Sequence, residues 1–221
     1  MSTRILVWDV PTRVFHWLLV LSFSVAFLTA ESERTRDTHV LFGYILLGLL
    51  GFRLLWGFVG TRYARFGSFL YGPGKVVAYV KSLIKRQPAH YLGHNPAGSV
   101  AIWLLLALGL TSGVSGVLVY QEVGGDVLEE LHDAVSYAML AVVAVHVLGV
   151  LVSSVMHREN LVRSMITGYK SDGQNEGIKR SYFWLGVIML VAVVGFWLAS
   201  PATGLVSPSG QAAHAGQNNN D

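Results

Sequence analysis

The sequence predicts an all-α membrane protein, in which a four-helix transmembrane bundle is joined by an additional fifth transmembrane helix. Of the 221 residues, 52% are hydrophobic and only 13% are charged, whereas a soluble domain carries roughly 25% charged residues. Five apolar stretches are each long enough to cross a bilayer as a helix. The length suits a single bundle, so we expect the lipid bilayer to surround most of this chain.

The first predicted span covers about residues 14–30, and Asp9 in the polar lead before it can cap a helix. A secretory signal peptide is the competing interpretation, because Leu-Thr-Ala at residues 28–30 resembles a cleavage site. The pair His16 and Trp17 at the start of the apolar region is unusual for such a peptide, so we favour a retained span.

The other spans are predicted at about residues 39–59, 99–120, 131–156 and 182–200. Residues 74–86 place apolar side chains on one side of a helix and basic ones around the rest, which is typical of an interfacial helix lying on the membrane. We divide the chain into a bundle at 1–170, a linker and fifth helix at 171–200, and a disordered periplasmic tail at 201–221. The fifth helix is a candidate subunit contact.

The basic residues set the orientation, because Lys and Arg concentrate on the cytoplasmic side of a membrane. All 16 of them except Arg34 and Arg36 fall on one side of the five spans. The N-terminus is therefore predicted in the cytoplasm and the C-terminus on the outer side of the membrane. The same segregation accounts for the net charge of +3 without a nucleic-acid partner.

The fourth span carries two histidines, His132 and His146, which lie 14 residues apart. At 3.6 residues per turn this is about four turns, so both rings share one helical face, roughly 21 Å apart along the axis. Ionisable side chains inside a spanning helix are costly and usually functional. The directions of the spans put His39 and His132 near the outer surface, and His16 and His146 towards the inner one.

These matching depths predict two stacked haems, one bound by His39 and His132 and the other by His16 and His146. The chain has no cysteine, which excludes covalent c-type attachment and iron–sulfur clusters and favours two haem b groups. The alternative is that the four residues are packed, hydrogen-bonded core histidines. Gly43, one turn beyond His39, either lets a flat ring approach or lets helices pack closely.

Cationic side chains near each surface are candidates to bind the haem propionates. They are Arg13 and Arg158 on the inner side, and Arg34 or Arg36 on the outer side. For each one, the competing interpretation is an interfacial anchor that follows the positive-inside rule.

Several short motifs along residues 5–170 are specific as a set. They are Trp8-Asp9, Thr12-Arg13, His16-Trp17, His39, Gly43-Tyr44, Phe52-Arg53-Leu54, Trp56-Gly57, Leu92-Gly93-His94-Asn95-Pro96-Ala97-Gly98, His132, His146 and His157-Arg158-Glu159-Asn160. Together they resemble the prokaryotic cytochrome b561 family, close to the b-type cytochrome subunits of nickel–iron hydrogenases. The resemblance implies a four-helix di-haem b bundle, with ligands at the four histidines already named, that passes electrons between membrane quinone and a redox partner.

We therefore expect an electron carrier between the quinone pool and a periplasmic partner, such as a c-type cytochrome or an oxidoreductase subunit. Two histidines per iron leave no open coordination position, so we expect no substrate to bind at iron. His90 and His94 are assigned to a turn-rich inner loop and, with Tyr91, are candidates for the quinone pocket. An acidic outer group is either a surface that steers a basic partner or a plain solvated loop; its members are Glu122, Asp126, Glu129 and Glu130.

Two other functions remain open from the sequence. A superoxide oxidase, passing electrons from superoxide to quinone, would need a positively charged outer funnel, and only Arg34 and Arg36 are basic there. A transporter or zinc-binding bundle would need three or four ligands that converge at one point. The histidine pairs lie too far apart along the fourth span for that.

Overall fold

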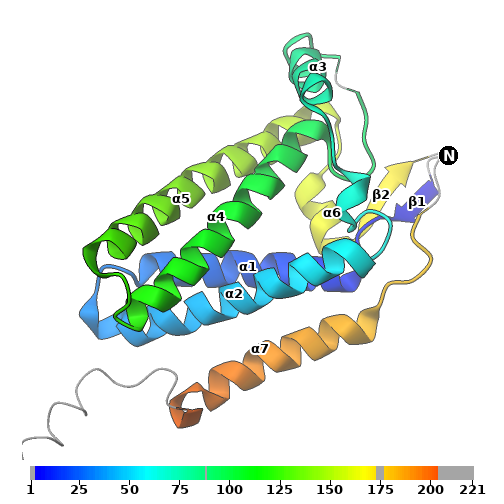
Figure 1. Cartoon of the computed structure of the whole chain (residues 1–221). Coiled ribbons are helices and arrows are strands. Elements are labelled where there is room, and N and C mark those ends of the chain that lie inside the picture. Colours follow the sequence, from blue (N-terminus) through cyan, green and yellow to red (C-terminus); the bar gives the residue numbers. More distant parts are fainter. Residues whose placement is uncertain (1–2, 88, 173–176, 204–221) are drawn as a thin grey trace, which may run out of the picture.

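The computed structural model describes residues 3–87, 89–172 and 177–203, and long helices dominate it (Figure 1). Five helices are long and apolar enough to cross a membrane. They are α1 (Val10–Leu28), α2 (Arg36–Val59), α4 (Pro96–Tyr120), α5 (Gly125–Met156) and α7 (Phe183–Thr203). The predicted all-α membrane class is confirmed.

Helices α1, α4 and α5 begin a few residues before the apolar stretches predicted for them. Asp9 accepts a 2.7 Å hydrogen bond from Thr12 N and so caps α1. Asn95 caps α4 in the same way, accepting from Gly98 N at 2.7 Å. The start of α5 lies at Gly125, so Asp126, Glu129 and Glu130 form helical turns rather than the expected loop, and only Glu122 precedes the helix.

Two antiparallel hairpins, α1–α2 and α4–α5, form the bundle, and they meet mainly through α2 and α4 (Figure 1). Glycines on α4 make this contact close. A Cβ on Gly113 would lie 2.9 Å from Leu47 Cδ1, and one on Gly109 would lie 3.0 Å from Leu50 Cδ1. Among the spanning helices of the described chain, α5 packs extensively only on α4, so helix packing does not close the space between α5 and the α1–α2 hairpin.

A two-stranded ribbon that the sequence analysis missed lies at the end of the bundle where α1 begins (Figure 1). Strand β1 (Thr3–Leu6) pairs antiparallel with β2 (Tyr169–Asp172), which follows the short helix α6 (Leu161–Thr167). Gly168 joins α6 to β2 with a φ of +87°, and a Cβ there would lie 2.7 Å from Trp8 O. The junction therefore requires glycine.

Helix α3 (Pro73–Ile84) occupies the position predicted for the interfacial helix at 74–86. It packs on α4, its Tyr79 is buried beside Tyr91, and Val77, Val80 and Ile84 stay exposed. Its place beyond the start of α4 (Figure 1) is where a membrane surface would lie if α4 spans the bilayer. Two short 3₁₀ helices, η1 (Glu33–Thr35) and η2 (Phe66–Ser68), lie in the connections.

Helix α7 packs lengthwise on α1, and it also touches α2. Its Met189 is buried in one apolar cluster with Phe15, Leu41, Ile45 and Leu49. One face of the fifth helix is thus part of the core of this chain, and only its opposite face remains open to lipid or to another subunit. Of the predicted tail, residues 204–221 lie outside the described residues.

Candidate functional site

The rings of His39 and His132 face each other between α2 and α5. Their centroids lie 6.0 Å apart, and the ring planes are at 88°. Metal–imidazole bonds are about 2 Å long, so two rings bound on opposite sides of one ion have centroids roughly 6 Å apart. The separation of this outer pair therefore fits a shared iron.

Backbone carbonyls fix which nitrogen of each ring is free. His39 Nδ1 lies 2.8 Å from Ala26 O, and His132 Nδ1 lies 2.9 Å from Ser112 O. A carbonyl only accepts hydrogen bonds, so each Nδ1 carries the proton and donates it. Both Nε2 atoms then keep their lone pairs, which is the arrangement found in most metal-binding histidines.

A cavity of about 440 Å³ surrounds the outer pair. Residues from α1, α2, α4 and α5 line it, among them Phe23, Phe27, His39, Gly43, Tyr44, Ser112, Gly116, His132 and Met139. A Cβ on Gly43 would meet no atom within 4 Å, whereas one on Gly116 would lie 2.8 Å from His132 Cε1. Gly43 therefore leaves open space beside the ring of His39, as a flat cofactor requires, and Gly116 gives room to the ring of His132.

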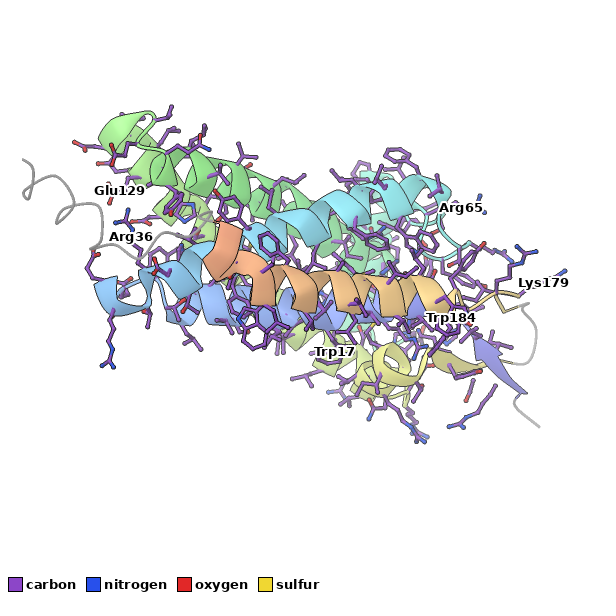
Figure 2. The ribbon with its side chains drawn as sticks, turned by 90° about the horizontal axis from the view of Figure 1, so that it is seen from below. Trp17, Arg36, Arg65, Glu129, Lys179 and Trp184 are labelled. Atoms are coloured by element: carbon purple, nitrogen blue, oxygen red, sulfur yellow. The ribbon has the colours of Figure 1, made fainter. Side chains whose placement is uncertain are left out.

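The mouth of this cavity mixes charges of both signs. Arg36 lines it together with Glu31, Glu33, Glu129 and Asp133. Figure 2 shows Arg36 and Glu129 at the same end of the bundle, opposite the end that carries Arg65 and Lys179. Arg36 is thus the predicted outer cation that lines this cavity.

The inner pair comes from α1 and α5. His16 on α1 and His146 on α5 are close enough to interact electrostatically, and His16 Nδ1 is buried without a hydrogen-bond partner. An imidazole nitrogen left unsatisfied in a bundle interior is a candidate to bind a missing group. The structure thus brings both predicted pairs to the same side of α5, one towards each end of the helix.

The two predicted inner propionate contacts differ in how they are held. Arg13 Nη1 donates a 2.7 Å hydrogen bond to Ile166 O of α6, while its Nε is buried without a partner. Arg158 follows the end of α5 with a φ of +51°, and its side chain makes no hydrogen bond to any described residue. One edge of Arg13 is therefore already occupied by the chain.

Two residues at the inner end matter more than the sequence suggested. Arg53 lies near the end of a span, where an arginine normally marks the membrane interface, but it is only 5% exposed, and its guanidinium lies over Phe66 and Phe69. His94, expected in an open loop, has its ring between Trp8 and Phe69, with centroid distances of 4.7 and 4.6 Å. Only tertiary packing reveals this, although both belong to the motifs that carried the family resemblance.

His90 stays exposed beside His157, with 5.9 Å between ring centroids. No group of three or more His, Asp or Glu side chains converges on one point among residues 3–87, 89–172 and 177–203. The geometry of the described part of the chain therefore gives no support to the zinc-binding alternative.

Spanning helices with paired imidazoles facing each other in the interior are the features of a membrane cytochrome. Residues 7–168 match the family described as prokaryotic cytochrome b561. The chain belongs to this family of b-type cytochromes, so haem b is the cofactor that membership implies. No solved structure matches the chain significantly.

The chain is also similar to proteins named as probable Ni/Fe-hydrogenase B-type cytochrome subunits. It is 24% identical over 217 residues to that of Rhodobacter capsulatus, which covers 76% of this chain and 82% of the relative. The protein of Azotobacter vinelandii is 24% identical over 217 residues, with 76% and 89% covered. The Ni/Fe-hydrogenase 1 subunit of Escherichia coli (strain K12) is 24% identical over 212 residues, with 75% and 90% covered.

Proposed function

We propose that this chain is a di-haem b-type cytochrome of a bacterial inner membrane, which transfers electrons between the quinone pool and a periplasmic redox partner. The observation that carries the proposal is the outer pair, in which His39 and His132 lie 6.0 Å apart with both Nδ1 atoms committed to carbonyls. His16 and His146 are proposed as the second pair of axial ligands.

In this proposal the chain would bind the haem groups and orient them, and the iron of a bound haem would supply one-electron oxidation and reduction. Two histidines for each iron would leave no open coordination position, which favours electron transfer over substrate binding at the metal. The carbonyls of Ala26 and Ser112 hold the outer rings in one orientation. The apolar helices keep water away, so little reorganisation accompanies each change of charge.

The two sites would carry electrons across most of the membrane thickness. His132 and His146 lie 14 residues apart on α5, a continuous helix, which separates them by roughly 21 Å. Two flat rings, each extending several ångströms from its iron, shorten the gap between the sites. We place quinone near the inner site, with His90 and Tyr91 as candidate contacts, and the partner at the outer site. The ring of His94 is packed against Trp8 and Phe69 and is therefore not kept among these contacts.

The relatives are named as subunits of Ni/Fe-hydrogenases, and we propose a periplasmic oxidoreductase subunit or a c-type cytochrome as the partner here. The first turns of α5 support this side for docking, because Asp126, Glu129 and Glu130 are exposed beside the outer cavity. An acidic surface attracts a basic partner and raises the rate of association. With the N-terminus in the cytoplasm, these residues face the periplasm.

A reduced-minus-oxidised visible spectrum with a pyridine haemochrome count tests the proposal. We expect two b haems per chain in the wild type, and loss of haem from each of the variants His16→Ala, His39→Ala, His132→Ala and His146→Ala. His157→Ala, at the end of α5, is the matched control and should keep both haems. A full haem count in all four variants would return these residues to the role of core histidines.

One residue favours the superoxide oxidase alternative, because the cationic Arg36 at the mouth of the outer cavity would attract an anion. Glu31, Glu33, Glu129 and Asp133 surround the same mouth, so an incoming anion would meet repulsion as well as attraction. The alternative predicts that superoxide reduces the outer haem in the purified chain, and the electron-carrier proposal predicts that it does so slowly or not at all.

A further inference from the structure

An unpaired guanidinium lies inside the inner end of the bundle. Arg53 is 5% exposed, and no described carboxylate lies within ion-pair distance of it. Its Nη1 is buried without a hydrogen-bond partner. Burying a charge without a partner costs several kcal/mol, so buried arginines are nearly always paired with an anion.

Asp9 is the nearest candidate within the chain, but its three hydrogen bonds go to other groups. Its Oδ1 accepts from Thr12 N at 2.7 Å. Its Oδ2 accepts from Trp56 Nε1 at 3.1 Å and from Thr61 Oγ1 at 2.6 Å. Asp9 lowers the electrostatic cost of burying Arg53, yet it leaves the N–H groups of the guanidinium without acceptors.

A second unsatisfied donor lies close by. His94 Nδ1 is buried without a partner, and its ring contacts the same Phe69 that lies under the guanidinium of Arg53. The aromatic rings of Trp8, Phe66 and Phe69 cover the faces of the two groups. Only the polar edges of Arg53 and His94 remain free, and an imidazole N–H and a guanidinium edge together suit a carboxylate.

The location of Arg53 and His94 indicates which carboxylate they would bind. His94 is close enough to Arg53, Lys170, His16 and His146 to interact with each of them electrostatically. The two propionates of a haem lie within a few ångströms of its ring edge. A haem bound between His16 and His146 would therefore carry them into this part of the bundle. We infer that Arg53 and His94 together bind one propionate of the inner haem, an assignment that rests on the proposed function.

The inner propionate contacts predicted from the sequence were Arg13 and Arg158, and Arg53 and His94 differ from both. Arg13 is tied to α6 through Ile166 O, and Arg158 lies beyond the end of α5. Arg53 is deeper than either, and aromatic rings exclude water from it. A charge-assisted hydrogen bond in such surroundings is stronger than one at the surface.

Infrared spectroscopy of the intact di-haem protein tests this directly. Haem made from aminolaevulinate labelled with ¹³C in its carboxyl carbon carries the label only in its propionates, so propionate bands separate from those of Asp, Glu and quinone. In reduced-minus-oxidised spectra we expect Arg53→Gln to shift one labelled carboxylate band, and His94→Asn to shift the same band. Arg65→Gln, at the same end of the molecule but exposed, should leave all labelled bands unchanged.

A redox titration gives the second readout. A buried cation beside a haem favours the reduced iron, so Arg53→Gln should lower the midpoint potential of the inner haem and leave that of the outer haem unchanged. The inner-haem potential of Arg53→Lys, which keeps the charge, should lie between those of the wild type and Arg53→Gln. If Arg53→Gln does not assemble, Arg53→Lys and His94→Asn carry the test, because both keep a donor at the site.

The outcomes separate this inference from the proposed function. Wild-type protein without haem would overturn both. Two haems with labelled bands that do not respond to Arg53→Lys, Arg53→Gln or His94→Asn would overturn the propionate assignment alone. A shift of the inner-haem potential that disappears once quinone is extracted would also overturn it, because the two donors would then be serving a quinone carbonyl.

Discussion

His39 and His132 come from helices that make little backbone contact, yet their rings lie 6.0 Å apart. Each ring is anchored on its own side by a carbonyl, that of Ala26 in α1 for His39 and that of Ser112 in α4 for His132. All four helices of the bundle therefore contribute to one pair of imidazoles. Small changes in the packing around the pair should change haem binding without removing a ligand.

Gly116 gives the first prediction. A Cβ at this position would lie 2.8 Å from His132 Cε1 and 3.1 Å from its Nδ1, so Gly116→Ala must displace the ring and strain its bond to Ser112 O. Groups that orient a metal ligand typically change affinity by about 10–100-fold. We expect a comparable loss of affinity for the outer haem, measured by haem titration of the purified chain. Gly149→Ala on α5, where a Cβ meets nothing within 4 Å, should bind haem normally.

Gly43 gives the opposite case, because the space beside it is empty. A Cβ there would meet no atom within 4 Å, and the residue lines the outer cavity. Gly43→Leu should therefore fold normally but fill space that a haem needs. We expect one haem per chain instead of two, with unchanged helix content by circular dichroism. Gly51→Leu on the same helix has similar room but does not line the cavity, and it should keep both haems.

The sequence could predict the features that depend on local pattern. The five spans follow from runs of apolar residues, and the apposition of His39 and His132 follows from the direction of each span. The ribbon could not be predicted, because β1 and β2 are four-residue strands at opposite ends of the bundle sequence. The burial of Arg53 was also hidden, since an arginine near the end of a span normally lies at the interface.

Asp9 gives a prediction about stability. It caps α1 and also accepts hydrogen bonds from Trp56 and Thr61, so it ties the start of α1 to the end of α2. Loss of a cap costs about 1 kcal/mol, and leaving buried donors unpaired costs about 1–3 kcal/mol more. Asp9→Ala should lower the Tm of the protein in detergent by several degrees. Asp37→Ala, in the first turn of α2 without a side-chain cap bond, should change it much less.

Lys170 predicts a dependence on pH. Burial lowers the pKa of Lys170 below its ordinary value, and Glu159, 3.6 Å away, only partly offsets this. Between the folded and unfolded pKa the unfolded chain binds the extra proton, so this group makes stability rise with pH in that window. As the pH rises towards the ordinary lysine pKa of about 10.4, wild type should gain Tm relative to Lys170→Arg, whose side chain stays charged. Parallel Tm curves for the two proteins would show that Lys170 keeps its proton throughout.

Gly186 tests whether α7 belongs to the bundle. A Cβ at Gly186 would lie 2.6 Å from Val10 Cγ1 and 3.4 Å from Val14 Cγ2, whereas one at Gly195 would meet nothing within 4 Å. The same substitution, glycine to valine, therefore forces α7 away from α1 at the first position and is harmless at the second. Overpacking typically costs about 1–3 kcal/mol. We expect Gly186→Val to lower the Tm of the isolated chain and Gly195→Val to leave it unchanged or slightly raised, because a helix interior disfavours glycine. Equal Tm values for both variants would mean that α7 does not stabilise the isolated chain. The role of α7 would then be to contact another subunit rather than to pack on α1.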